Sequence, residues 1–318
     1  MELINHTPYP SLLFRTNLDG DLFACSACAK VTYDITGEGV FLSDAQKWEV
    51  YKEITQTTNG YLDSDNVFKR GGTDILLFGK AKSPDGIPVR QMDVVVSING
   101  NLFHTVRVFG NRFWEKSLLG LSISTPESFT EMPLTLENAY GGKAKWDGLE
   151  MPFGYNQFGK GYYWQKDDCI NNPLPNIEHT TDLIRNWFDQ PDPAGVACLP
   201  MSALRVKHFI KYNEEGKINS FDARFYNAAF PGMIAPAIAA GDEIAVSGMS
   251  SKLFRFKVPD HKINMSVQVG EHKKEWRMYI EQVGIDIERH EAFILYRYPF
   301  TYTFRPHEKR VCEIFETV

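Results

Sequence analysis

The sequence contains little cysteine and no long run of apolar residues. Its five cysteines are an odd and sparse set in a chain of 318 residues, which argues against a disulfide framework and favours a reducing compartment. No stretch reaches the roughly 18 apolar residues that a membrane-spanning helix needs. The chain also begins without the basic residues and apolar core of a signal peptide. We therefore expect a soluble, cytoplasmic protein with no membrane-inserted part.

Clusters of positive charge are absent as well. The net charge is -6, and lysine and arginine occur in no run longer than a pair such as Lys273-Lys274. Proteins that bind duplex nucleic acid normally concentrate basic residues on one face. Nucleic acid is therefore not expected as a partner.

The usual signatures of catalytic and metal sites are missing too. The eight histidines form neither an HxH nor an HExxH pattern, and no glycine-rich segment has the spacing of a phosphate-binding loop. Cys25 and Cys28 have the CxxC spacing of a zinc half-site, but they lie in the run 22–33, which is typical of a buried strand. A separation of three residues in a strand points the two thiols to opposite faces. We expect no catalytic residues, no metal and no cofactor.

Strand patterns dominate what the sequence does contain. Aromatic residues, which favour strands, make up 13% of the chain. Two strand-like runs, 93–98 and 103–109, flank Asn99-Gly100, a strong hairpin turn. Apolar and polar residues then alternate with period two over 254–258, 265–269, 276–280 and 300–304. The predicted fold is mainly β, with few short helices and antiparallel sheets that form sandwich- or barrel-like lobes.

The predicted organisation is a single unit, 1–318, with two tentative β lobes, 1–137 and 201–318. The segment 138–200 joins them, since it is rich in glycine, proline, asparagine and aromatic residues and has little periodicity. Inside it, Thr180 or Thr181 is a suitable cap for a short helix that carries apolar residues to position 188.

A weak similarity links 77–109 with 253–280, since each begins with Leu-Phe and runs through Lys-x-Pro-Asp-like residues into a hairpin. The two segments are either a duplicated β unit or two unrelated hairpins. The sequence leaves both alternatives open.

Several aperiodic segments together carry a resemblance to one bacterial family. These segments, in chain order, are 1–9, Ala29-Lys30-Val31-Thr32-Tyr33, Arg70-Gly71-Gly72-Thr73-Asp74, 129–135, Ala139-Tyr140-Gly141-Gly142-Lys143, Pro173-Leu174-Pro175-Asn176-Ile177-Glu178 and Phe225-Tyr226-Asn227-Ala228-Ala229. They resemble the domain-of-unknown-function family that is encoded beside type VI secretion effectors with PAAR-like tips. The resemblance runs over almost the whole chain, and the sequence departs from the family pattern at 225–227 and 230–232.

This resemblance implies a non-catalytic adaptor or chaperone. Such a protein binds and stabilises a type VI effector and helps to load it, through the PAAR-like domain of the effector, onto the VgrG spike. The expected partners are therefore the effector and VgrG. The motif residues are expected to fix backbone geometry rather than to contact a partner: Arg70, Gly71, Gly72, Asp74, Gly141, Gly142, Asn176 and Asn227.

Capture of a partner needs exposed apolar surface or a free strand edge. Two stretches are candidates, an aromatic one at 155–164 and an apolar loop at 230–240. For each, a buried loop that closes a core is the alternative. The candidate binding residues are Tyr155, Phe158, Tyr162, Tyr163, Trp164, Phe230, Met233, Ile234 and Ile238.

A glycan-binding or glycan-hydrolysing protein is the alternative function. The segment 146–168 places Trp146, Tyr162, Tyr163 and Trp164 near acidic residues such as Glu150 and Asp168. Aromatic platforms beside two carboxylates are what glycoside binding and hydrolysis require.

The strand geometry at the two N-terminal cysteines generates a testable prediction. Because Cys25 and Cys28 point to opposite faces, they cannot ligate one ion together. Metal analysis of the purified protein should therefore find no zinc that is lost on replacing both residues with serine. Stoichiometric zinc that depends on these two thiols would contradict the prediction.

Overall fold

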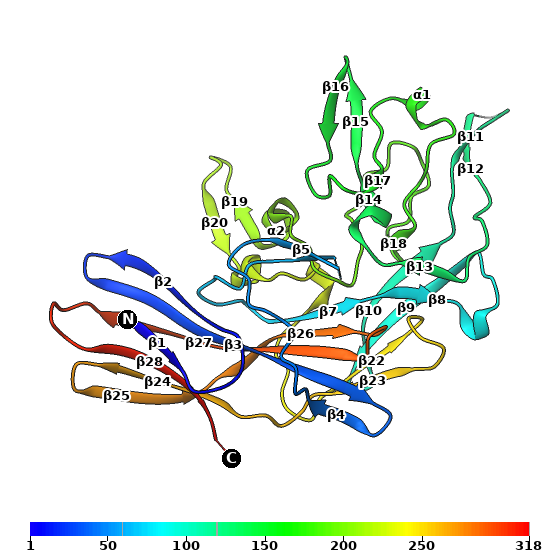
Figure 1. Cartoon of the computed structure of the whole chain (residues 1–318). Helices are drawn as coiled ribbons and strands as arrows, with labels where there is room; N and C mark the ends of the chain where they lie inside the picture. The colour runs from blue at the N-terminus through cyan, green and yellow to red at the C-terminus, as the bar shows by residue number, and fades with distance from the viewer. Residues whose placement is uncertain (59, 119, 318) are drawn as a thin grey trace.

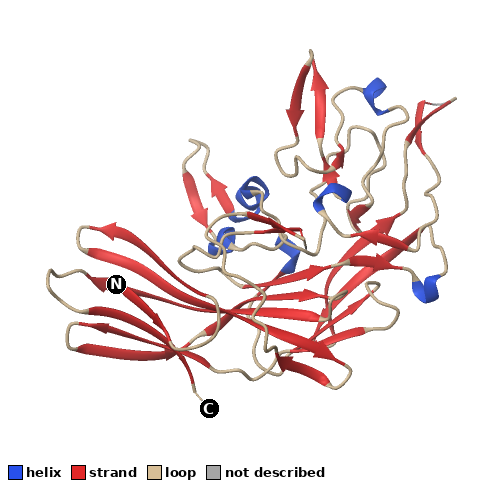
Figure 2. Ribbon diagram, viewed as in Figure 1, coloured by secondary structure: helices blue, strands red, loops and turns tan. Residues whose placement is uncertain are grey.

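In a computed structural model the chain is mainly β, as the sequence predicts. The structure describes residues 1–58, 60–118 and 120–317. Within them, 50% of residues lie in strands and 8% in helices, and most strand pairs are antiparallel. The described strands form several open sheets, not a closed barrel. Figure 2 shows how strands dominate and how short the helical segments are.

A seven-stranded sheet forms the centre of the molecule (Figure 1). Its longest strands, β3 (Leu22–Thr36) and β27 (Glu291–Thr303), pair antiparallel from Leu22 to Asp34. On the side away from β3, β27 pairs antiparallel with β26. The next strand, β7, runs parallel to β26. The remaining bounds are β2 (Ser11–Asp19), β4 (Gly39–Leu42), β7 (Thr73–Phe78), β21 (Ile234–Ala235) and β26 (Tyr279–Asp286).

Two smaller sheets lie at the two ends of the seven-stranded sheet (Figure 1). A four-stranded sheet has the order β1 (Glu2–Asn5), β28 (Arg310–Glu316), β24 (Ile263–Val269) and β25 (His272–Arg277). A five-stranded sheet has the order β18 (Ile177–His179), β10 (Asn101–Phe109), β9 (Gln91–Ile98), β22 (Glu243–Ser247) and β23 (Phe254–Lys257). One continuous apolar core includes residues from all three sheets.

The strands of the two predicted β lobes share these sheets. The N-terminal strand β1 pairs with the C-terminal β28, β3 pairs with β27, and β7 pairs with β26. The tentative division at 137 and 201 is therefore corrected, since each half supplies strand edges that only the other half fills. The two similar segments, 77–109 and 253–280, also begin in different sheets, because β7 lies in the seven-stranded sheet and β23 in the five-stranded one.

Short two-stranded units lie outside these three larger sheets, and several of them are hairpins that project from one side of the framework (Figure 1). Most of them belong to the segment between β10 and β22. The pairs are β5 (Thr55–Thr57) with β6 (Gly60–Leu62), β8 (Lys80–Lys82) with β13 (Glu131–Pro133), β11 (Trp114–Ser117) with β12 (Gly120–Ile123), β14 (Tyr140–Gly141) with β17 (Lys160–Gly161), β15 (Lys143–Trp146) with β16 (Leu149–Pro152), and β19 (Ile210–Tyr212) with β20 (Ile218–Phe221). A small second core holds the irregular segment together, with Trp114, Tyr140, Phe153 and Tyr162 at its centre.

The helix predicted up to position 188 is absent, and residues 180–189 form turns and irregular backbone. Glu178 accepts the N–H of Ile184 at 2.9 Å, and Asp189 accepts the N–H groups of Arg185 and Asn186 at 2.8 and 2.7 Å. Carboxylates that bind nearby backbone donors compete with the hydrogen bonds of a helix. The α-helices of the described chain are α1 (Lys166–Cys169) and α2 (Ser202–Phe209), and single 3-10 turns are η1 (Pro84–Gly86), η2 (Leu136–Asn138), η3 (Ala223–Tyr226) and η4 (Pro231–Met233).

Several local strand predictions are confirmed, although the run 276–280 is divided at Met278 between β25 and β26. Asn99 and Gly100 join β9 to β10 with φ of 51° and 77°, the left-handed values that a tight hairpin needs. In β23, Phe254 and Phe256 are buried while Arg255 and Lys257 are exposed. The thiols of β3 also behave as predicted, because Cys25 packs in the main core and Cys28 against Leu12 and Leu295 on the other face.

A glycine in the central sheet gives a test of this packing. A Cβ at Gly284 in β26 would lie 2.1 Å from Cε1 of Phe293, its cross-strand neighbour, so the Phe293 ring covers the glycine. Gly284→Ala should therefore lower the free energy of unfolding by about 1–3 kcal/mol, as overpacking does. The control is Gly37→Ala, where a Cβ meets no atom within 4 Å, and its effect should stay within about 0.5 kcal/mol. Urea unfolding measures both, and equal effects would contradict the packing described.

Candidate functional site

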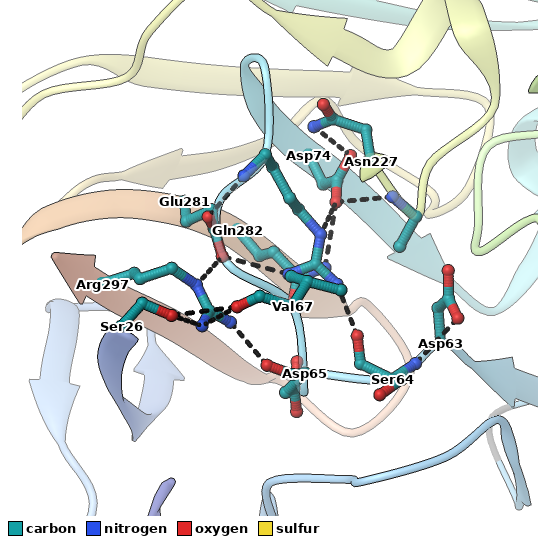
Figure 3. Close-up of polar contacts among 12 residues, drawn as sticks. Ser26, Asp63, Ser64, Asp65, Val67, Asp74, Asn227, Glu281, Gln282 and Arg297 are labelled. Carbon is teal, nitrogen blue, oxygen red and sulfur yellow. Dashed lines mark hydrogen bonds and ion pairs between the residues drawn. The ribbon is translucent and has the colours of Figure 1, made fainter. Parts of the chain in front are cut away.

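The residues of the Arg70 motif gather in a buried network of charged groups (Figure 3). The guanidinium of Arg70 donates to Glu281 Oε2 at 3.0 Å and lies 3.2 Å from Asp74 Oδ2. Arg297 donates to the same Glu281 oxygen at 2.5 Å. All four side chains are fully buried, and their two positive charges balance two negative ones. We call Arg70, Asp74, Glu281 and Arg297 the charge network.

Each arginine of the charge network also binds main-chain oxygens of the segment before β7. Arg70 donates to the carbonyl of Ser64 at 2.9 Å. Arg297 donates to the carbonyls of Asp65 and Val67 at 2.7 and 2.8 Å. Buried charges are tolerated when they are paired and their remaining donors are satisfied. The network therefore fixes the path of this loop against β26 and β27.

Asp74 and Asn227 extend the network to the distant loop 227–229. Asn227 donates to Asp74 and to the carbonyl of Gly72, both at 2.9 Å, and accepts the N–H of Gly71 at 2.9 Å. Asp74 accepts the N–H groups of Ala228 and Ala229 at 2.9 and 3.1 Å. Burial raises the pKa of the Asp74 carboxyl, while the nearby Arg70 opposes that rise.

The motif glycines are required by close approach of the backbone. A Cβ at Gly71 would lie 2.3 Å from the backbone nitrogen of Arg224, and one at Gly72 would lie 2.6 Å from the carbonyl oxygen of Ala235. Gly141 has φ of +148°, and its Cβ would lie 2.0 Å from the carbonyl oxygen of Asn156. Gly142, with φ of +102°, is similar, since its Cβ would lie 2.7 Å from the carbonyl oxygen of Gly159.

Asn176 ties the second core to the five-stranded sheet. Its side chain is fully buried and donates to the carbonyl of Phe109 in β10 at 3.0 Å. Next to it, Glu178 and Arg112 form a buried ion pair. Burial raises the pKa of Glu178, and the charge of Arg112 opposes this. Asn176 therefore stabilises the fold from a buried position, as the other motif residues do.

The apolar loop proposed as a capture surface lies inside the protein. Phe230, Met233, Ile234 and Ile238 are between 0% and 8% exposed and belong to the main core. The loop pairs through Ile234 with Asp74 of β7, and the ring of Phe230 lies against Gly195. Of the two alternatives for this loop, the buried one is observed, so partner binding through these four residues is corrected.

The aromatic stretch is divided between core and surface. Tyr162 is buried in the second core, Phe158 stacks on Tyr61 with ring centroids 5.0 Å apart, and Tyr163 donates to the carbonyl of Pro173 at 2.6 Å. Tyr155 is half-buried with its ring 5.3 Å from that of Phe153. Trp164 alone of the five candidates in this stretch is exposed, at 43%.

Trp164 belongs to a larger set of exposed apolar side chains, of which the sequence identified only Trp146 and Trp164 as candidate binding residues. Eighteen large apolar side chains are exposed in the described chain, and nine of them lie in the third of the sequence from 118 to 226. They are Leu118, Trp146, Leu149, Trp164, Phe188, Tyr212, Ile218, Phe221 and Tyr226. The sequence does contain a signal for the hairpin β15–β16, because Asp-Gly is a typical tight-turn pair. Asp147 and Gly148 form that turn with φ of 47° and 78°.

Five of these nine residues lie on the hairpins β15–β16 and β19–β20, which we call the projecting hairpins. Both extend from the same side of the seven-stranded sheet (Figure 1). On the first, Trp146 and Leu149 are cross-strand partners, and the ring of Trp146 lies 6.2 Å from that of Trp164. At the base of the second, Phe221 lies 5.7 Å from Phe225 and 5.6 Å from Tyr226.

Within 1–58, 60–118 and 120–317, no three or more histidine, cysteine, aspartate or glutamate side chains are grouped to hold a metal ion. Burial raises the pKa of both Cys25 and Cys28 to about 11. No helix among these residues is long and apolar enough to cross a membrane.

One known protein family matches most of the chain. The family described as "Uncharacterized protein conserved in bacteria (DUF2169)" matches residues 23–297. The chain belongs to this family. The match spans the charge network, from β3 to Arg297, and both projecting hairpins. Neither a curated protein nor a solved structure matches the chain.

The charge network makes a sharp stability prediction. Glu281→Gln keeps the shape of the side chain but leaves Arg70 and Arg297 with one carboxylate fewer in a site without water access. The loss should be about 3–5 kcal/mol of unfolding free energy, as for a buried pair that loses one partner. Glu150→Gln, in an exposed pair with Lys143, is the control and should cost less than about 1 kcal/mol. Similar denaturation midpoints for the two variants would contradict the prediction.

Proposed function

We propose that this protein is a non-catalytic adaptor that binds and stabilises a type VI secretion effector in the cytoplasm. In this proposal it helps to load the effector, through a PAAR-like domain, onto the VgrG spike. The observation that carries the proposal is the concentration of exposed aromatic and aliphatic side chains on the projecting hairpins. The chain-long resemblance of the sequence motifs supports the identity of the partner.

Exposed apolar side chains that cluster on one side of a protein mark a surface for binding another protein. Tryptophan and tyrosine are the residues that most often dominate the free energy of such interfaces. Trp146 is 47% exposed and Trp164 is 43% exposed, although their rings lie near each other. Their apolar area is therefore available to a partner.

The form of the projecting hairpins adds to this argument. A two-stranded hairpin is only marginally stable in water, because it has two free edges and little buried surface. Each projecting hairpin pairs with no third described strand. A partner segment that adds a strand or covers an apolar face would bury what the hairpin leaves in water.

The base of each hairpin, by contrast, is firmly held. In α2, immediately before β19, Arg205 donates to the carbonyl of Asn227 at 2.9 Å and forms an ion pair with Asp63 at 2.7 Å. Beside β15, the N–H of Gly142 donates to the carbonyl of Asn156 at 2.8 Å. Rigid support lowers the entropy cost of binding, since the apolar tips are presented in a fixed position.

A glycan-binding or glycan-hydrolysing activity is the second candidate function. The exposed pair of Trp146 and Trp164 favours it, because paired tryptophan faces can stack on sugar rings. On this hairpin, Glu150 accepts a hydrogen bond from Lys143 Nζ at 3.0 Å. A glycan array screened with the purified protein, and a reducing-sugar assay, test this candidate directly.

The adaptor proposal predicts rescue of the effector encoded beside this gene. The effector expressed alone should be mostly insoluble, and co-expression with this protein should raise its soluble yield and lead to co-purification. A partner present at 100 times its dissociation constant stabilises a folded protein by about 2.7 kcal/mol, a large share of a typical domain's stability. Equal soluble yield with and without the adaptor, and no co-purification, would contradict the proposal.

Matched pairs of variants locate the binding surface. Leu149→Asp and Ile218→Asp change the projecting hairpins, where these side chains are 63% and 60% exposed. Leu253→Asp and Ile87→Asp are the controls, at 50% and 64% exposure elsewhere on the molecule. All four should keep the melting temperature of the adaptor, and only the hairpin variants should lose the effector. Loss with all four, or with none, would contradict the assignment of the surface.

A further inference from the structure

A cleft of about 870 Å³ lies at the junction of the three sheets, and the residues that line it do not belong to the projecting hairpins. It is lined by β4, by the loop before β22, by the linker 258–262 between β23 and β24, and by the junction of β25 with β26. Clefts of roughly 300–1,000 Å³ at the meeting of structural units are the usual sites of small ligands.

The walls of this cleft are mostly apolar. Val40, Ile238, Val258, Met278 and Ile280 line it, together with the rings of Tyr279 and Tyr296. Ligand pockets typically combine such walls with a few polar groups that fix the orientation of the ligand. The walls therefore favour a ligand with an apolar body.

The charged groups of the cleft have an excess of positive charge. They are Lys257, Arg277 and Asp260. Arg277 donates to Asp260 at 3.1 Å, so those two charges compensate each other. Lys257 is exposed at the end of β23, and among the described residues its cross-strand neighbour Glu243 forms an ion pair with Arg255 and not with Lys257. The ammonium group of Lys257 can therefore pair with an anion, although the net charge of the chain is -6.

Hydrogen bonds hold the linker wall in place before any ligand arrives. His261 contacts the hydroxyl of Tyr33 through Nδ1 at 2.7 Å and the carboxylate of Glu316 through Nε2 at 2.6 Å. The hydroxyl of Tyr33 lies 3.1 Å from that of Tyr296. The N–H of Val258 donates to the carbonyl of Asp242 at 2.8 Å. A preorganised wall avoids part of the entropy cost of binding.

We propose that this cleft binds a small organic acid with an apolar body, its carboxylate at Lys257 and its body against Val40, Tyr279 and Ile280, the lining residues with accessible apolar surface. The inference does not depend on the adaptor function, because it uses none of the residues on the projecting hairpins. A charged hydrogen bond to Lys257 gives about a tenfold or greater preference for the acid over its uncharged analogue.

Isothermal titration calorimetry of the full chain with octanoate tests the proposal. Octanoate should bind with one site per chain. Acetate, which lacks the apolar body, and 1-octanol, which lacks the charge, should each bind at least about tenfold more weakly. Absence of octanoate binding, or equal affinity for octanoate and 1-octanol, would overturn the proposal.

Two variants place the bound acid in this cleft. Lys257→Gln should weaken octanoate binding about tenfold and leave 1-octanol unchanged, while the control Lys252→Gln, an exposed lysine in the turn before β23, should change neither. Ala240→Trp, at an exposed position on the cleft wall, should abolish binding of both ligands without lowering the melting temperature. Octanoate affinity that is unchanged in Lys257→Gln or in Ala240→Trp would overturn the assignment.

Discussion

The buried charge network is the interaction on which the rest of the structure depends. The carboxylate of Glu281 in β26 forms ion pairs with two arginines, Arg70 from the segment before β7 and Arg297 from β27. These groups come from distant parts of the sequence, so they assemble only when the N-terminal and C-terminal strands have paired in one register. Charged groups buried without a partner cost several kcal/mol each. Any shift in that register would leave at least one of them unpaired.

The same network connects the central sheet to the surface that we propose for partner binding. Asp74 and Asn227 join β7 to the loop 227–229, and Arg205 joins that loop to α2, which leads directly into β19. The rigid interior and the exposed hairpin are therefore parts of one continuous arrangement. The motif residues are buried, while the apolar residues on the hairpins are exposed, so fold and recognition are assigned to different sets of side chains.

The sequence predicted the β class, the Asn99-Gly100 hairpin and the separation of Cys25 from Cys28, because each depends on local periodicity or turn chemistry. It did not predict how the halves interleave, since strand pairing between residues as far apart as Leu22 and Thr303 leaves no local signal. The loop at Ile234 has the composition of either a core or a binding surface, and only its pairing with β7 decides between them. The helix predicted up to position 188 does not form, because the carboxylates of Glu178 and Asp189 accept the backbone N–H groups of Ile184 and Arg185.

Native-state hydrogen exchange measures most directly whether the charge network holds the molecule together. The amides of Arg70, Gly71 and Ala228 donate to side chains of Glu281, Asn227 and Asp74, outside any regular strand ladder. If the network is the central constraint, these amides should exchange as slowly as those of β3 and β27, by global unfolding, while the amides of β15–β16 and β19–β20 exchange much faster. Exchange of the three network amides at the rate of the projecting hairpins would contradict the account.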